Sequence, residues 1–112
     1  MTMVDLRQLQ RDIFENAVQK GFHDDLHRAL PLTTHPELVA KRLALIHSEV
    51  SEALEELRKP DCSVERFAEE LADVVIRTLD LAEVVGVNLQ FFMLEKIEKN
   101  KSRPRMHGGK RF

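Results

Sequence analysis

The fold is decided by residues 36–86, which read PELVAKRLALIHSEVSEALEELRKPDCSVERFAEELADVVIRTLDLAEVVG. Apolar residues recur there every three or four positions, as in an amphipathic helix, on both sides of a break at residues 60–62. Pro36 favours the first turn of a helix, Ser63 is a good N-terminal cap, and Gly86 is a good stop. We therefore expect two helices, and because the break is so short they should pack as antiparallel neighbours.

Two further helices are expected outside this stretch. One covers about residues 4–20 and ends at Gly21, and the other follows the capping residue Asn88 and runs to about Asn100. A polar connector, residues 22–35, joins the first helix to the second. No strand-like alternation competes with these helices, so the sequence predicts an all-α fold resembling a four-helix bundle. A chain of this length buries only a modest core by itself, so oligomerisation is an option.

The composition limits the class of protein. With 112 residues, 43% hydrophobic and 32% charged, the chain fits one globular domain rather than a disordered segment. No apolar run approaches the ~18 residues of a membrane helix, and the first ten residues lack the apolar core of a secretory signal. A single cysteine, Cys62, excludes an internal disulfide framework. We therefore expect a cytoplasmic protein without a membrane partner.

The net charge of −2 conceals two oppositely charged regions. Residues 99–112 contain six basic residues and no acidic one, which leaves a net charge of −8 on residues 1–98. We therefore divide the chain into a helical domain, residues 1–104, and a basic C-terminal tail, residues 105–112. The acidic body opposes a polyanion, and the chain has no Trp or Tyr on which bases could stack, so no nucleic-acid partner is expected.

Helices two and three each carry a pair of acidic residues with the same spacing. Glu49 and Glu52 form one pair, and Glu70 and Asp73 form the other. Three residues turn a helix by about 300°, so the two acids of a pair lie on one face, one turn apart. Both pairs are offset in the same direction from the apolar side of their helix. In an antiparallel hairpin, equal offsets bring the four carboxylates together.

Four converging carboxylates repel one another unless a cation lies between them. Mg²⁺, with Mn²⁺ as a substitute, prefers oxygen ligands and leaves part of its coordination shell to water or phosphate. The sequence has no Cys/His cluster of the kind that binds zinc. Acidic pairs are also common on solvated helix faces, and that interpretation stays open at this point.

Four other residues are candidates for substrate contacts. Arg77 lies one turn beyond Asp73, where it can reach a phosphate or pair with a carboxylate. Phe22 can stack on a base or plug the core, and Asn16 can hydrogen-bond a base edge or lie on the surface. Lys110 follows two glycines whose free backbone N–H groups can wrap a phosphate, although a solvated tail is the commoner explanation.

The acidic pairs, separated by 17 residues, resemble the metal motif of the MazG-like all-α nucleoside triphosphate pyrophosphohydrolases. The resemblance extends over residues 36–104 and includes LIHSEVSEAL (45–54), EELADVV (69–75), GVNL (86–89) and EKIEKNKSRP (95–104). Lys20-Gly21-Phe22 also fits. The chain departs from the pattern at His23, where relatives often have Trp, and at Arg105 and Met106, where many have an aromatic residue.

The resemblance implies a homodimer or homotetramer that cleaves a nucleoside triphosphate, including modified or deoxy forms, to the monophosphate and pyrophosphate with Mg²⁺. Such a house-cleaning hydrolase acts on acid anhydrides. The implied metal ligands are Glu49, Glu52, Glu70 and Asp73. The implied phosphate-side residues are Lys96, Asn100 and Arg103. The candidates for a catalytic role are Glu49, Glu52 and Lys96.

Two alternatives remain at the level of sequence. One is a phosphoribosyl-ATP pyrophosphohydrolase of the same superfamily. The other is a non-enzymatic helical module whose acidic face and basic tail bind a protein or nucleic acid. The nucleotide, the number of metal ions and the carboxylate that serves as a base are not determined by these residues.

Overall fold

Four helices form the structure, a computed structural model that describes residues 3–26 and 34–105. They are α1 (Leu6–Gln19), α2 (Pro36–Arg58), α3 (Val64–Val84) and α4 (Leu89–Lys101). The described ranges contain no strand, so the predicted all-α class is confirmed. The helices begin and end within two residues of their predicted bounds. In the part of the chain that is described, no helix is long and apolar enough to span a membrane.

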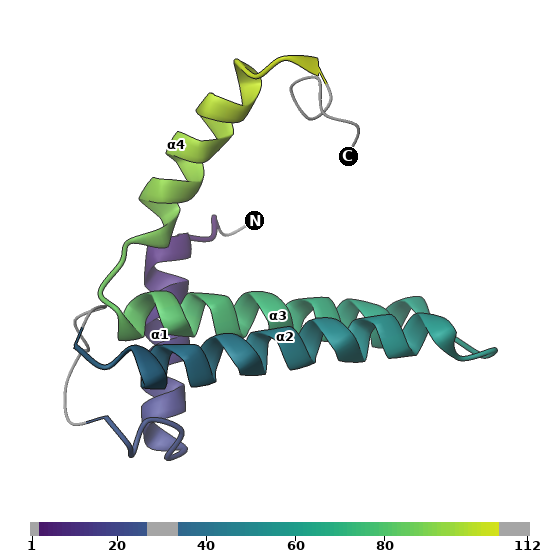
Figure 1. Cartoon of the computed structure of the whole chain (residues 1–112), viewed down its shortest axis with the longest axis horizontal. Helices are drawn as coiled ribbons and strands as arrows, with labels where there is room; N and C mark the ends of the chain where they lie inside the picture. The colour runs from purple at the N-terminus through teal and green to yellow at the C-terminus, as the bar shows by residue number, and fades with distance from the viewer. Residues whose placement is uncertain (1–2, 27–33, 106–112) are drawn as a thin grey trace.

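Helices α2 and α3 form the predicted antiparallel hairpin (Figure 1). Ser63 caps α3 as expected, because its hydroxyl accepts a hydrogen bond from the Arg66 N–H at 3.3 Å. The buried carboxylate of Glu56 accepts bonds from the Ser63 N–H at 3.0 Å and from Arg66 Nε at 2.8 Å, and it pairs with Lys59 at 3.1 Å. Burial alone raises the pKa of Glu56, but these donors outweigh it and lower the pKa overall.

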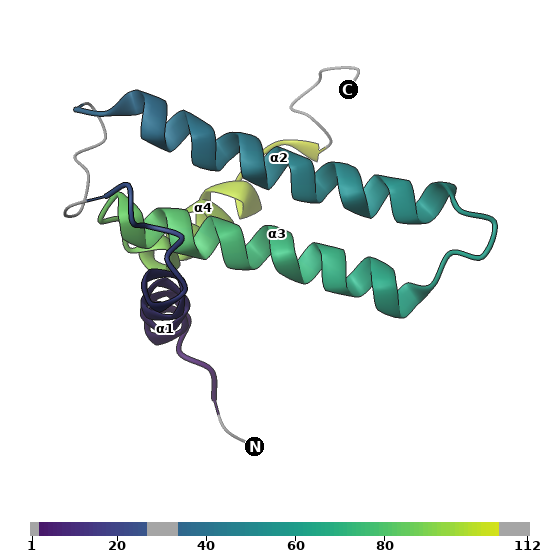
Figure 2. The same cartoon turned by 90° about the horizontal axis from the view of Figure 1, so that it is seen from below.

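Helix α1 crosses the hairpin at a steep angle, and in Figure 2 it is seen end-on beside α3. Gln10 anchors it, because this fully buried side chain donates to Glu83 Oε1 and to the Val87 carbonyl, both at 2.8 Å. Arg7 Nη1 pairs with the same Glu83 oxygen at 2.9 Å. The N-terminal cap is Asp5, whose carboxylate accepts from the Arg7 N–H at 3.0 Å. These bonds fix α1 to the end of α3.

The buried apolar core is small and lies mainly on the C-terminal half of α3, with contributions from α2. Its described members are Val39, Ala53, Leu79, Ala82 and Val84. Several residues that the helical spacing assigns to the interior of the hairpin are instead half exposed, with Val50 at 51% and Leu54 at 57%. One chain therefore leaves much of the apolar face of its hairpin uncovered.

Helix α4 does not close a four-helix bundle with the hairpin of its own chain. It packs to a small extent against α1 and rises away from α2 and α3 (Figure 1). The Cα radius of gyration is 16.7 Å, whereas a compact chain of this length has about 13 Å. The accessible surface is 9070 Å², against about 6,300 Å² for a compact monomer of this mass. A single chain is thus an open arrangement of helices.

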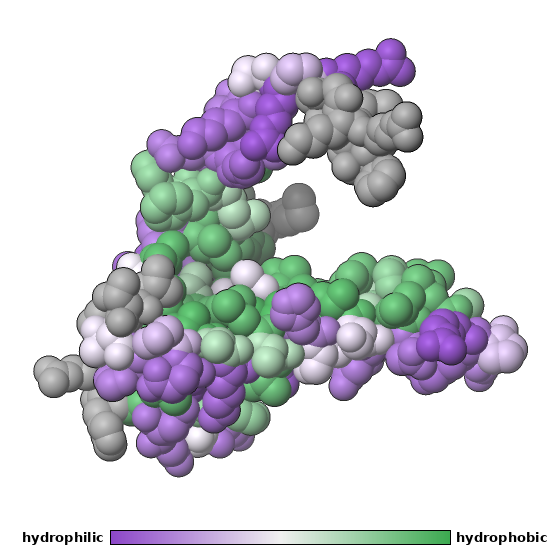
Figure 3. All heavy atoms as spheres, in the orientation of Figure 1, coloured by the Kyte–Doolittle hydropathy of each residue, from purple (hydrophilic) through white to green (hydrophobic). Residues whose placement is uncertain are grey.

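The exposed apolar side chains gather on both sides of the hollow between the hairpin and α4. Figure 3 shows them along the edge of the hairpin that faces α4 and over the lower part of α4 itself. We call this set the concave apolar face. The exposed apolar residues that supply it are Leu43, Val50, Leu54 and Leu57 of α2, Leu71 and Val75 of α3, and Phe91, Phe92, Met93, Leu94 and Ile97 of α4. Because residues 91–94 are consecutive, they surround α4, and only some of them point into the hollow. Monomeric proteins seldom expose so many apolar side chains together.

Candidate metal centre

Three carboxylates from the two helices of the hairpin meet at one point. Glu49 of α2 and Glu70 and Asp73 of α3 each offer an oxygen atom, and these atoms lie within 4.8 Å of one another. The helical register explains the meeting, because acids one turn apart on one helix face a counterpart across the antiparallel partner. The predicted convergence of the acidic pairs is therefore present for three of their four members.

The fourth predicted member, Glu52, lies on the exposed side of the cluster and interacts with Glu70. Burial raises the pKa of Glu70, and the hydrogen bond and negative charge of Glu52 raise it further. The charges of Asp73 and Glu49 act in the same direction. In the absence of a cation, Glu70 therefore retains its proton to a higher pH than an ordinary glutamate.

Two oxygen atoms in the cluster are buried without any donor. Glu49 Oε2 and Glu70 Oε2 find no hydrogen-bond partner among the described residues, and Glu49 is only 7% exposed. An unpaired buried oxygen is costly, since the group loses its water and gains nothing in return. Two oxygens of the cluster thus lack a donor among the described residues.

Arg77 supplies the one cation that Glu49 contacts among the described residues. Its Nε donates to Glu49 Oε1 at 2.7 Å. The sequence left open whether Arg77 reaches a phosphate or pairs with a carboxylate, and the structure shows the pairing with a carboxylate. This bond uses Oε1, whereas the buried Oε2 of Glu49 has no hydrogen-bond partner among the described residues.

The donor set fits a hard divalent cation better than any other metal. All the converging atoms are carboxylate oxygens, and no histidine or cysteine belongs to the cluster in the described residues. Oxygen ligands with room for water are what Mg²⁺ and Mn²⁺ prefer, whereas zinc sites use nitrogen and sulfur. A cation between the carboxylates would satisfy the two buried oxygens that otherwise have no partner.

A cavity of about 470 Å³ adjoins the cluster, between α1 and the hairpin. Glu49 and Asp73 belong to both the cluster and the cavity wall. Phe22 and Asn16, the predicted base contacts, line the cavity, and Phe22 is 67% exposed rather than a plug of the core. The full lining is Asp12, Ile13, Asn16, Ala17, Phe22, Glu49, Asp73, Ile76, Arg77 and Asp80.

The predicted phosphate-side residues of α4 do not line this cavity in one chain. Lys96, Asn100 and Arg103 are exposed on or just beyond the helix that rises away from the hairpin (Figure 1). Lys96 instead lines a shallow depression formed by residues of α4 alone. Their spacing places all three on one helical face only if the helix reaches Arg103, whereas α4 ends at Lys101. The spacing also contains no information on where α4 points. Lys110 lies outside the described residues.

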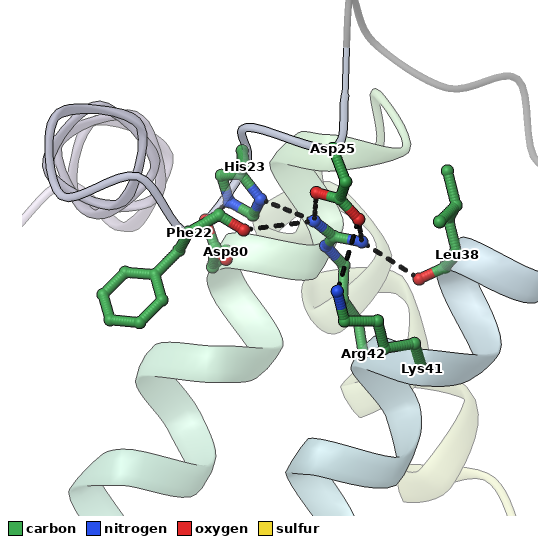
Figure 4. Close-up of polar contacts among 7 residues, drawn as sticks. All are labelled: Phe22, His23, Asp25, Leu38, Lys41, Arg42 and Asp80. Atoms are coloured by element: carbon green, nitrogen blue, oxygen red, sulfur yellow. Dashed lines mark hydrogen bonds and ion pairs between the residues drawn. The ribbon is translucent and has the colours of Figure 1, made fainter.

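The sequence interpretation missed a polar network beside the cavity, which Figure 4 shows. His23 is 7% exposed and joins Arg42 of α2 to Asp80 of α3, with 2.9 Å at each ring nitrogen. Arg42 in turn pairs with Asp25 at 2.9 Å and holds the pKa of that carboxyl at about 2. The hint in the sequence was an arginine on the apolar side of a helix, next to Val39 and Leu43.

Comparison of the chain with protein-family models, with curated proteins and with solved structures gave no match. The functional argument therefore rests on the cluster, the cavity and the residues that surround them.

Proposed function

We propose that this protein is a Mg²⁺-dependent nucleotide pyrophosphohydrolase, which cleaves a nucleoside triphosphate to the monophosphate and pyrophosphate. The observation that carries the proposal is the pair of buried oxygens, Glu49 Oε2 and Glu70 Oε2, which have no hydrogen-bond partner among the described residues. They belong to a cluster that adjoins a cavity of about 470 Å³. A solvated acidic face would point its carboxylates to water. The resemblance of the acidic pairs and of residues 95–104 to MazG-like enzymes supports the same activity.

The residues that would hold the cation are Glu49, Glu52, Glu70 and Asp73. When bound, Mg²⁺ neutralises phosphate charge and lowers the pKa of water. The six-oxygen shell that it prefers leaves places for substrate oxygens once these carboxylates have bound. Without the cation the same carboxylates would repel a triphosphate, so binding of substrate should depend on it.

The chain contributes orientation and electrostatics to hydrolysis at the α-phosphorus. Arg77 holds Glu49 by a charge-assisted bond, which restricts the carboxylate to one orientation. Glu49, held in this way, or the neighbouring Glu52 can accept a proton from the attacking water. Most of the acceleration of phosphoryl transfer comes from such positioning and from stabilised charge.

The nucleoside is assigned to the cavity between α1 and the hairpin. Phe22 offers an exposed ring on which a base can stack, and Asn16 offers both a donor and an acceptor to its edge. Asp73 lines the same cavity, so a base held there has its phosphates near the acidic cluster.

We further propose that the protein is a homodimer or homotetramer formed through the concave apolar face. The surface exposed beyond that of a compact monomer is of the size that permanent dimers bury, about 2,000 Å² or more. A second copy carries the same apolar residues and requires no other partner. The positions of Lys96, Asn100 and Arg103 in one chain mean that their contact with substrate needs a closure of α4 or an α4 from a second copy.

Release of pyrophosphate from a panel of nucleoside triphosphates and deoxynucleoside triphosphates tests the proposal. We expect turnover with Mg²⁺ and none with a chelator. Substitution Glu52→Gln should lower kcat/KM by about 100-fold or more, since it removes a ligand and a candidate base. The control is Glu55→Gln, which changes an exposed glutamate that pairs with Arg58 instead. No turnover of any member, or equal turnover in Glu52→Gln, would reject the proposal.

Two alternatives have their own tests. Phosphoribosyl-ATP in the same panel separates the histidine-pathway reaction from that on free nucleotides. A non-enzymatic interaction module predicts no metal-linked stabilisation, so its melting temperature should not respond to Mg²⁺ with a non-hydrolysable nucleotide. A rise in melting temperature that needs both ligands favours the enzyme.

A further inference from the structure

The turn after α1 directs two adjacent aromatic side chains to different environments. Gly21 has φ +83°, a conformation that L side chains rarely adopt, and it reverses the chain at the end of α1. Phe22 then lines the cavity, while His23 is buried between the helices (Figure 4). The His23 ring stacks on Phe14 of α1 with 5.2 Å between centroids. The turn is therefore held to all three helices that surround the cavity.

The partners of His23 determine which of its nitrogens carries the proton. Arg42 Nη2 lies 2.9 Å from Nδ1, and a guanidinium has donors only, so Nδ1 accepts. The proton of the neutral ring is then on Nε2, which donates to Asp80 Oδ1 at 2.9 Å. Asp25 holds Arg42 through both nitrogens of its fork, at 2.9 and 3.4 Å. This chain of bonds fixes the orientation of the Asp80 carboxylate.

Asp80 and Asp73 lie on the same side of α3, seven residues apart. Two helical turns correspond to about 10 Å along the axis, which is about the length of a nucleoside. Both residues line the cavity, Asp73 at the acidic cluster and Asp80 two turns away. A nucleotide with its phosphates at the cluster would therefore place its base near Asp80.

Two carboxylates of the cavity wall, Asp12 and Asp80, offer acceptors to a base. The donors of the wall are the Asn16 amide and the Nη groups of Arg77, whose Nε is used on Glu49. A carboxylate accepts from an exocyclic amino group, as it does from the amino group of cytosine in DNA. A base with a carbonyl at the same position places its oxygen against the carboxylate. Both groups are then acceptors, and neither receives a hydrogen bond.

We infer that Asp80 is the specificity-determining residue of the proposed nucleotide site and that His23 is its positioning residue. The geometry selects nucleobases with an amino group on the reading edge over those with a carbonyl at that position. The inference rests on the proposed function and adds the class of substrate. A site built to bond an N–H group rejects the analogue that lacks it, because its own acceptor is left unpaired.

The test compares kcat/KM for pairs of substrates that differ at this group, dCTP against dUTP and dATP against dITP. The wild-type protein should prefer the amino member of each pair by about tenfold or more. In Asp80→Asn, whose amide both donates and accepts, the ratio should move toward one by about tenfold. The matched control is Asp24→Asn, in an exposed aspartate of the same turn, which should leave the ratio unchanged.

The role of His23 is separated from a general contribution to folding by two variants. His23→Leu removes the donor to Asp80 and should reduce the amino preference. His23→Gln retains an N–H donor and should restore much of the preference, with a far-UV spectrum like that of the wild type. A merely structural histidine would lower kcat/KM for both members of a pair equally and leave their ratio unchanged.

The outcomes distinguish the inference from the function on which it rests. Equal turnover of both members of each pair by the wild type, or an unchanged ratio in Asp80→Asn, overturns the role of Asp80 but leaves the pyrophosphohydrolase intact. Preference for the carbonyl members overturns it as well. No turnover of any nucleotide overturns both.

Discussion

Glu49 brings together the features on which the candidate site depends. It is nearly buried, Arg77 donates to one of its oxygens, and the other oxygen has no hydrogen-bond partner among the described residues. It also belongs to the cluster with Glu70 and Asp73. A buried carboxylate with an unpaired oxygen destabilises the fold by itself. Such destabilising groups are typical of functional sites. The meeting of the acidic residues could be predicted from sequence, since it follows from helical geometry alone.

The partners from distant parts of the chain could not be predicted in this way. His23, Arg42 and Asp80 come from a turn and two helices, and nothing in their spacing along the chain brings them together. The pairing of Arg77 with Glu49 has the same origin: the sequence left it open because it depends on which face of α3 meets α2.

Substitution Glu70→Gln should stabilise the protein in the absence of metal. The raised pKa of Glu70 means that the folded state loses stability as pH rises from the usual range of a glutamate through that higher value. A neutral amide avoids this loss. In the presence of a chelator at neutral pH, the variant should melt at a higher temperature than the wild type, and the difference should vanish below about pH 4.

The same variant, Glu70→Gln, should lose the rise in melting temperature caused by Mg²⁺, whereas an unaltered rise would show that Glu70 does not bind the cation.

The pair Asp25–Arg42 should lose its contribution to stability only in strong acid. Its pKa of about 2, lowered from 3.8 chiefly by the hydrogen bond of Arg42, means that the ion pair contributes fully above pH 3.8 and is lost as pH falls toward 2. Urea unfolding of the wild type and of Asp25→Asn as a function of pH measures this directly. The two should differ by a constant amount at neutral pH and converge between pH 3.8 and 2. A difference that already disappears near pH 6 would contradict the assignment.

At the scale of elements, the helices follow from local signals. Ser63 and Asn88 cap their helices with side-chain bonds of 3.3 Å, and Gly21 and Gly86 end helices with positive φ, as the sequence indicates. The direction of each helix is a different matter. The steep crossing of α1 depends on buried polar bonds such as that of Gln10. Glutamine is usually a surface residue, so the sequence does not indicate that this side chain is buried.

The turn of the hairpin offers a test at this scale. Substitution Glu56→Gln weakens the charge-assisted bonds to Lys59, Ser63 and Arg66, which should cost about 1–3 kcal/mol in the free energy of unfolding. The neighbouring Glu55→Gln affects only an exposed pair and should change stability by less than about 0.5 kcal/mol. Chemical denaturation measures both, and equal effects would mean that the buried carboxylate does not hold the turn.

The whole molecule presents an acidic site and an uncovered apolar face on the same hairpin. The length of the chain makes an oligomer an option, and the resemblance implies one. The open arrangement of one chain exposes the surface through which the proposed self-association would occur. What the sequence does not contain is the position of α4, since its amphipathic pattern is weak and its packing on the rest of the chain is slight.

Substitution Leu54→Glu should disrupt self-association. Leu54 lies at 57% exposure on the concave apolar face, so a charge there is tolerated by one chain and not by a buried interface. Sedimentation should show the wild type at twice or four times the mass of 13.0 kDa and the variant at lower mass. A wild type that sediments as a monomer would contradict the proposed assembly.

The most direct test of the pyrophosphohydrolase is the fate of the attacking oxygen. The reaction is carried out in water labelled with ¹⁸O, with Mg²⁺ and the nucleotide that is turned over fastest, and the products are separated and weighed by mass spectrometry. Attack at the α-phosphorus puts the label in the nucleoside monophosphate and leaves the pyrophosphate unlabelled, which is the predicted result. Label in the pyrophosphate, or products that are a diphosphate and inorganic phosphate, would contradict the account.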